Sequence, residues 1–407
     1  MRGTHTDRYG ALLLLLSWLG LGLLSFPVVL AASARYPVSV LEQQVPISPP
    51  RPLSGDYRER TLVDPLFRWD AMYHFPRIVA QGYVSGVAKL AFYPLFPLSA
   101  RVLHMVGMNP YVSLLLVAWI GTLAYLLVFH RLAGLDLPGE DADWAVSLLM
   151  VFPMSMILYV PYMESLFLFF AAAALLFARL RLWLVAGLAG MLAALTKQPG
   201  ILLAIPLAIE LLADSSKHRR GLWQTMGSWF SIALIPLAFV SWTIFRVLTF
   251  EPTFTFHANL APTILELLVS SNAGEMVLSR PFAWPWQIIG EAIDLAIKLP
   301  FVRLNVLFNL GGYVAVVQLL AGTWRFLRLA YRAYALAVLV LSLLDYSMSV
   351  NAVPFPSLFR HAYLAIPVFI GVPRLVRGRF ARVIYASLCL VGFLVLLYGY
   401  VMKAWIV

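Results

Sequence analysis

The chain has few charged residues for its length. Of its 407 residues only 12% are Asp, Glu, Lys or Arg, whereas 61% are hydrophobic. Ordinary soluble domains carry about 25% charged and about 45–50% apolar residues. With so few charged residues, the folded chain could not cover its apolar residues with a polar surface. The composition therefore excludes a typical soluble enzyme and favours a protein embedded in a membrane.

Cysteine is nearly absent, and motifs for cofactors are missing. The single Cys389 lies within an apolar run, which excludes an intrachain disulfide and a cysteine-based metal cluster. The sequence has no nucleotide-binding motif, and the spacing of Asp70, His74 and His104 matches no metal-ligand pattern. We therefore expect neither a bound cofactor nor a metal site.

Basic residues outnumber acidic ones, giving a formal net charge of +11. They stand in short clusters between apolar runs, which is how proteins encode their orientation in a membrane. This distribution argues against nucleic acid as a partner, because nucleic-acid binding requires a continuous basic patch.

What the sequence has in abundance is apolar runs of roughly 17 to 25 residues, the length that an α-helix needs to cross a bilayer. They predict an all-α integral membrane protein, a single polytopic bundle over residues 1–407 with about eleven transmembrane helices. The first run is too long for the apolar part of a signal peptide, about 7 to 15 residues, so we expect an uncleaved span. The expected spans cover residues 11–31, 110–130, 144–160, 163–178, 182–196, 199–213, 224–248, 304–323, 331–347, 357–373 and 383–403.

Alternate connections between these runs carry the basic clusters, and the positive-inside rule places them in the cytoplasm. Two long connections, residues 32–109 and 249–303, then lie outside. The first of these is basic, but loops longer than about 60 residues translocate largely regardless of charge. The cytoplasmic connections contain Arg131; Arg179 and Arg181; Lys217, Arg219 and Arg220; Arg325, Arg328 and Arg332; and Arg374, Arg377, Arg379 and Arg382.

One further apolar stretch, residues 91–107, lies inside the first outer loop. Pro94 and Pro97 interrupt it, and Arg101 and His104 stand in its middle. A span there would invert every later connection, so we expect an amphipathic interfacial helix or a re-entrant one. The chain is thus a multi-pass protein, of the plasma membrane if bacterial and of the endoplasmic reticulum if eukaryotic.

The segment 67–74 of the first outer loop mixes charged and aromatic residues. A carboxylate at Asp70 beside Trp69 would be partly desolvated and could act as a base, while Arg68 could keep it ionised. The alternative is a solvated loop with an Arg–Asp pair on the surface, and spacing alone does not separate the two interpretations.

Lys197 interrupts about thirty apolar positions, residues 182–213. A continuous helix of that length would measure about 45 Å, longer than the hydrocarbon core, so Lys197–Gly200 must form a tight turn or a broken helix. A charge at the middle of the membrane costs about 2.5–3.5 kcal/mol, which favours a tip near the outer surface. A snorkelling lysine is the alternative. Glu164, at the outer end of another span, could orient a basic residue, bind an acceptor or simply interact with its helix dipole.

Three blocks in chain order resemble the PIG-V-like family, membrane mannosyltransferases related to the enzyme that adds the second mannose to GPI anchors. Two positions depart from the family pattern: Lys197–Gln198 replaces an Arg-containing turn, and His361 replaces a Tyr. Both bear on the sugar and acceptor preferences. The blocks are Arg68-Trp69-Asp70 with residues 78–83, 91–97 and Arg101; residues 161–167 with 193–200 and Pro206; and residues 357–361 with Pro367.

The resemblance implies a GT-C fold and inverting transfer of a sugar, with mannose favoured, from a polyprenyl- or dolichyl-phosphate donor. The acceptor would be an extracytoplasmic hydroxyl of a membrane-bound glycan or glycolipid. By this analogy Asp70 is the general base, and basic residues meet the departing phosphate without a metal or a nucleotide. The residues expected to bind substrate are Arg68, Trp69, Tyr73, Glu164, Lys197, Gln198, Arg360 and His361.

Two other functions stay open at the level of sequence. A lipid or sugar transporter or flippase would also have charges and broken helices in its membrane domain, although such sites lie near the midplane between repeats. A non-catalytic subunit of a glycolipid assembly complex is the second alternative, and it would lose nothing on Asp70→Asn.

Overall fold

The computed structural model describes residues 4–34, 64–83, 92–217, 221–250, 278–279, 283–344, 349–350, 355 and 357–402. Most of the second outer loop, 249–303, therefore lies outside the described residues, as do much of the first and Asp345. The backbone of Tyr73 is described but its side chain is not.

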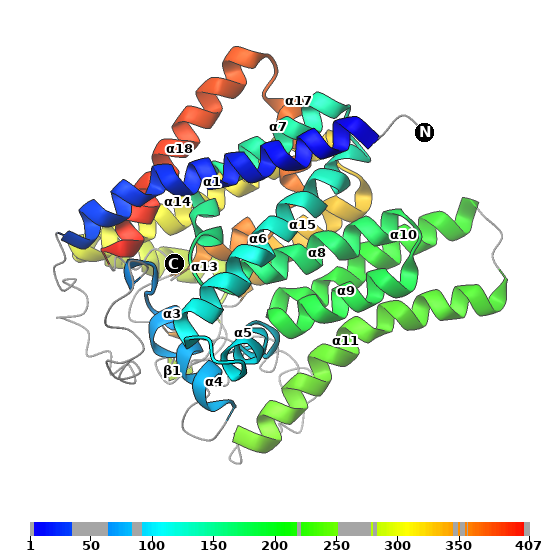
Figure 1. Ribbon diagram of the computed structural model, residues 1–407, viewed down its shortest axis with the longest axis horizontal. Helices are drawn as coiled ribbons and strands as arrows, with labels where there is room; N and C mark the ends of the chain where they lie inside the picture. The colour runs from blue at the N-terminus through cyan, green and yellow to red at the C-terminus, as the bar shows by residue number, and fades with distance from the viewer. Residues whose placement is uncertain are drawn as a thin grey trace.

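Long apolar helices run side by side through the molecule (Figure 1). Within the described residues, six helical stretches are long and apolar enough to cross a membrane: 15–32, 110–134, 198–216, 222–245, 302–326 and 379–401. They belong to α1 (Thr4–Ala34), α6 (Pro110–Gly134), η3 (Gln198–Leu203) with α10 (Ala204–Lys217), α11 (Leu222–Phe250), α14 (Pro300–Thr323) and α18 (Arg379–Val401).

Shorter apolar helices complete the bundle: α8 (Glu164–Arg179), α9 (Trp183–Thr196) and α15 (Leu329–Leu344). Nine of the eleven expected runs thus fall on one long helix or helical stretch each. The chain is an all-α, multi-pass membrane protein, as its apolar runs predict.

Two expected spans are not continuous helices. Residues 144–160 divide into α7 (Gly139–Met150) and the 3-10 helix η2 (Pro153–Leu158), and residues 357–373 divide into α16 (Leu358–Tyr363) and α17 (Val368–Leu375). Pro153 and Pro367 stand at the breaks, and proline has no N–H with which to continue a helical ladder. Apolar length alone was therefore a wrong guide to helix continuity in these two runs.

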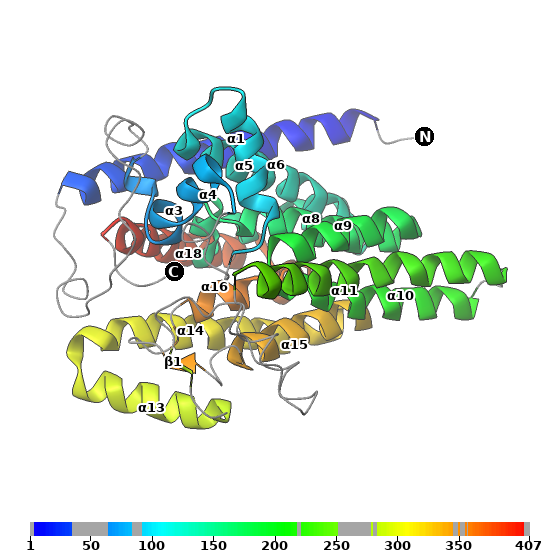
Figure 2. The ribbon, with the colours of Figure 1, turned by 90° about the horizontal axis from the view of Figure 1, so that it is seen from below.

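Short helices gather at one end of the bundle, where α1 ends and α6 begins (Figures 1 and 2). They are η1 (Asp64–Leu66), α3 (Asp70–Tyr73), α4 (Phe75–Gln81) and α5 (Leu95–Met105). The expected amphipathic helix is α5, whose 11 residues reach only about 16 Å, too short to span a core about 30 Å thick. Arg101 on α5 donates to the Val79 carbonyl of α4 at 2.8 Å and holds the two helices together.

Ion pairs join the opposite ends of the helices. Arg179 of α8 contacts Asp136 at 2.7 Å, and Arg328 donates twice to Glu210 of α10, at 2.9 and 3.0 Å. Arg382 of α18 pairs with Asp141 of α7. Several of the basic residues that the sequence assigns to the cytoplasmic side therefore also tie neighbouring helices together.

The remaining elements lie along α14. The amphipathic helix α13 (Pro285–Lys298) packs on it, with Ile288 and Ala292 buried between them. The 3-10 helix η5 (Trp324–Phe326) follows α14, and a two-residue antiparallel pair joins β1 (Leu278–Ser279) to β2 (Ser349–Val350). Helix α14 also packs against α16, and this contact supports the site described next.

Candidate functional site

Glu164 lies at the centre of a buried charged cluster. Its carboxylate is fully buried and contacts the Lys197 Nζ at 3.0 Å and the Arg360 Nε at 3.4 Å. The side chains of both cations keep 10% exposure. A buried carboxylate thus contacts two cations whose side chains are still partly accessible. These cations can bind an anion through charge-assisted hydrogen bonds.

Lys197 reaches this cluster because its helix ends there. Helix α9 stops at Thr196, Lys197 is extended, and η3 starts at Gln198. Gly200 makes the turn tight, since a Cβ on it would lie 2.4 Å from the Ala194 backbone nitrogen. The break predicted from the length of the apolar run is confirmed.

Arg360 lies on α16, far from Glu164 and Lys197 in the sequence. This short helix is held by α14, where the buried Asn309 accepts a hydrogen bond from the Phe359 N–H at 3.2 Å. The guanidinium carbon of Arg360 lies 5.1 Å from the centre of the Tyr162 ring, within the range of a cation–π interaction. Tertiary packing therefore brings Arg360 to Glu164.

His361, next to Arg360, is buried in the same region. The two ring nitrogens of an imidazole can serve as a hydrogen-bond donor and an acceptor, so His361 adds a polar group beside the two cations.

Asp70 begins α3 and is half-buried. It follows Trp69 in the turn whose Arg68 carbonyl accepts a hydrogen bond from the Tyr162 hydroxyl at 3.2 Å. The ring of the same Tyr162 carries the Arg360 guanidinium, so Tyr162 lies between the turn that precedes the predicted base and the cation predicted to bind phosphate.

Arg68 is buried and holds the turn in front of Asp70. Its Nε donates to the Val401 carbonyl of α18 at 2.9 Å and its Nη1 to the Phe67 carbonyl at 2.7 Å. The Tyr400 hydroxyl accepts from the Arg68 N–H at 3.2 Å and donates to the Leu66 carbonyl at 2.9 Å. These contacts hold the segment before Asp70 against the C-terminal end of α18.

Backbone strain concentrates beside the site. Among the described residues four non-glycine residues have positive φ, and three of them are Trp69 (51°), Phe355 (52°) and Ser357 (66°). Trp69 precedes Asp70, and the other two precede Arg360. Strained conformations of this kind persist only where the surrounding structure enforces them, as at active sites.

The other predicted residues are placed as follows. Gln198 is buried at the start of η3, and its Nε2 makes no hydrogen bond within the described part of the chain. Trp69 is half-buried beside Asp70. No group of three or more His, Cys, Asp or Glu in the described ranges is arranged to hold a metal ion.

Sequence reasoning missed Tyr162, Tyr400 and Asn309. Tyr162 stands inside the block of residues 161–167, which points to the segment but not to this side chain. Tyr400 and Asn309 lie in apolar runs. A polar residue in such a run often stands at a contact between helices, and this was the one feature of the sequence that could have identified them.

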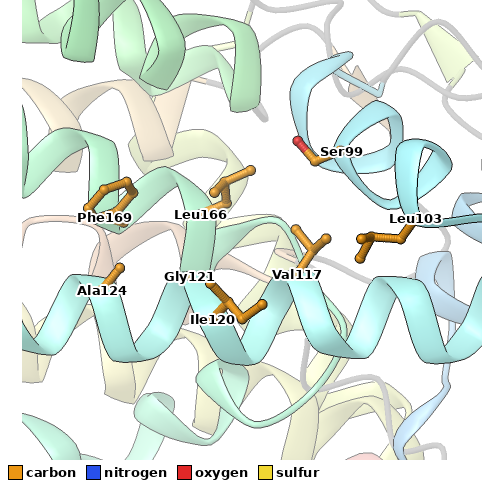
Figure 3. A pocket seen from close by; sticks show the side chains of 8 residues that line it. All are labelled: Ser99, Leu103, Val117, Ile120, Gly121, Ala124, Leu166 and Phe169. Atoms are coloured by element: carbon orange, nitrogen blue, oxygen red, sulfur yellow. The ribbon is translucent and has the colours of Figure 1, made fainter.

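A separate apolar pocket of about 250 Å³ lies between α5, α6 and α8 (Figure 3). Leu166 lines it, two residues after Glu164, so the two side chains leave α8 on nearly opposite sides. The pocket has no charged lining and is not part of the charged cluster. It is lined by Ser99, Leu103, Val117, Ile120, Gly121, Ala124, Leu166 and Phe169.

Comparison with solved structures shows the fold. ArnT from Cupriavidus metallidurans bound to undecaprenyl phosphate matches with a TM-score of 0.51 and 13% sequence identity, over 96% of this chain and 77% of that one. The oligosaccharyltransferase from Archaeoglobus fulgidus in its apo form gives a TM-score of 0.42 and 11% identity, over 95% and 56% of the two chains. Both are glycosyltransferases of the GT-C superfamily. No family model and no curated protein matches the sequence.

The likeness to ArnT extends over nearly the whole chain. The protein therefore has a GT-C-type polytopic fold, as the resemblance noted in the sequence implies.

Proposed function

We propose that this chain is a membrane glycosyltransferase of the PIG-V-like kind. It moves mannose from a polyprenyl- or dolichyl-phosphate donor to a hydroxyl group of a membrane-bound glycan or glycolipid outside the cytoplasm. The observation that carries the proposal is that Lys197 and Arg360 meet on Glu164, while Tyr162, whose ring carries the Arg360 guanidinium, hydrogen-bonds to the Arg68 carbonyl in the turn that leads into Asp70.

The chemistry follows from these positions. The acceptor oxygen attacks C1 of the sugar while Asp70 takes the hydroxyl proton, and the bond from C1 to the phosphate oxygen breaks with inversion. The electron pair of that bond stays on the lipid phosphate. Lys197 and Arg360 stabilise the resulting charge through charge-assisted hydrogen bonds.

A buried donor supports an anionic ligand at this cluster. Gln198 Nε2 is buried and lacks a hydrogen-bond partner within the described structure, and an amide N–H can donate to a phosphate oxygen. Unsatisfied groups of this kind are uncommon in folded proteins and are explained when a ligand or water completes them. The solved ArnT structure with undecaprenyl phosphate bound adds a precedent for a lipid phosphate on this fold.

The test uses purified protein in nanodiscs with radiolabelled polyprenyl-phosphate mannose and a lipid extract as acceptor. Asp70→Asn should lower turnover at least about a hundredfold, the lower end of the effect of a positioned base. Asp294→Asn is the control, since Asp294 is exposed on α13 and pairs with Lys298 of the same helix. Undiminished transfer by Asp70→Asn would rule out the base, and no transfer by the wild-type protein would rule out polyprenyl-phosphate mannose as the donor.

A further inference from the structure

Tyr162 contacts both halves of the candidate site. It stands in the turn between η2 and α8 and is only 1% exposed. Its hydroxyl donates to the Arg68 carbonyl at 3.2 Å, and its ring face carries the Arg360 guanidinium at 5.1 Å. One side chain thus joins the turn that presents Asp70 to the cation proposed to bind phosphate.

The hydroxyl end acts on a strained turn. The Arg68 carbonyl also accepts from the Ala71 N–H at 3.2 Å and so closes the turn that contains Trp69 and Asp70. Trp69 has a φ of 51° there, a conformation that favours glycine and has to be held by its surroundings. Loss of the Tyr162 hydroxyl removes one of the groups that hold it.

The ring end is itself fixed. Phe75 and Tyr400 pack edge-on against the Tyr162 ring, with centroids at 6.1 and 6.2 Å. The Tyr162 ring is therefore held in place and cannot follow a movement of Arg360. The hydroxyl is bonded to this rigid ring, so its position relative to the ring is fixed as well.

We propose that Tyr162 is a positioning residue that fixes the distance between Asp70 and Arg360, and hence between the base and the phosphate of a bound lipid-phosphate sugar. This inference rests on the proposed function. The hydroxyl acts through Asp70 on the chemical step, and the ring acts through Arg360 on donor binding.

The experiment separates the two ends by substitution, using the nanodisc assay with polyprenyl-phosphate mannose. Tyr162→Phe keeps the ring and should lower kcat at least tenfold while the donor KM stays within threefold. Tyr162→Leu removes the ring as well and should also raise the donor KM at least fivefold. The matched control is Tyr159→Phe, three residues earlier, whose buried hydroxyl donates to the Trp18 carbonyl at 3.3 Å; its kcat and KM should stay within twofold of wild type.

A double variant distinguishes positioning from a general loss of structure. In an Asp70→Glu background, where the carboxylate is already displaced, adding Tyr162→Phe should change kcat less than twofold. Wild-type kcat in Tyr162→Phe, or the same tenfold loss in the Asp70→Glu background, would overturn the inference. Full activity of Asp70→Asn would instead overturn the proposed base, so the two failures are distinguishable.

Discussion

At the scale of single residues, the most informative feature is one buried carboxylate that contacts two cations, so the cluster keeps a net positive charge. Glu164 is completely buried, and its charge is stabilised by Lys197 and Arg360. Removing one member of such a group leaves an uncompensated charge in a medium of low dielectric constant. The cluster therefore links the stability of the protein to its proposed anion site.

We expect Glu164→Gln to lower the free energy of unfolding by about 3–5 kcal/mol, the range for breaking a buried ion pair. Adding Lys197→Met should recover part of that loss, because it removes one of the two charges left without a counter-ion. Denaturant titration in mixed micelles measures both effects. As a control, Asp294→Asn breaks an exposed ion pair and should lower the free energy of unfolding by no more than about 1 kcal/mol. If Lys197→Met lowered the free energy of unfolding further when added to Glu164→Gln, the proposed charge balance would be wrong.

At the scale of elements, helix α14 supports the helix that presents Arg360. The two helices touch at Gly312, where a Cβ would lie 2.1 Å from Cγ of the Phe359 ring. A few residues away, Asn309 accepts from the Phe359 N–H. Since Phe359 directly precedes Arg360, any displacement at this contact moves the guanidinium.

Two adjacent glycines allow a matched test of this contact. Gly312→Ala should cost about 1–3 kcal/mol through overpacking and should raise the donor KM, because it pushes α16 away. Gly311 has nothing within 4 Å of its Cβ position, so Gly311→Ala should leave activity unchanged and gain about 0.5–1 kcal/mol from helix propensity. Thermal unfolding and donor titration measure the pair, and equal behaviour of the two variants would show that α16 does not rest on α14.

At the scale of the whole molecule, we predict that the short helices α3–α5 lie on the outer side and the ion-paired helix ends in the cytoplasm. The assignment rests on the distribution of Lys and Arg in the connections. Gln81 on α4 and Glu140 on α7 are exposed positions at the two ends, and the chain has a single native cysteine. These features make the orientation directly measurable.

In a Cys389→Ser background, we expect a membrane-impermeant maleimide to label Gln81→Cys in intact cells or right-side-out vesicles. Glu140→Cys should be labelled only after permeabilisation. The reverse pattern would place Asp70 in the cytoplasm and would exclude transfer from an extracytoplasmic donor.

The sequence by itself determined the class of the molecule and most of its helices. Apolar length and the position of charges are local properties, so they identified nine apolar helical segments, the short amphipathic α5 and the break at Lys197. They failed at 144–160 and 357–373, where the helices break at Pro153 and Pro367, because hydropathy does not register the N–H that a proline lacks.

Only the tertiary structure decided how the candidate site is assembled. Glu164 and Lys197 are 33 residues apart, Tyr162 and Arg68 are 94 apart, and Arg68 and Tyr400 are 332 apart. No local pattern records which distant helices pack together, because their contacts depend on packing and on satisfying buried polar groups throughout the bundle. The sequence could nominate Asp70, Lys197 and Arg360, but the contacts of Tyr162 with the Arg68 carbonyl and the Arg360 guanidinium follow only from the packing of distant helices.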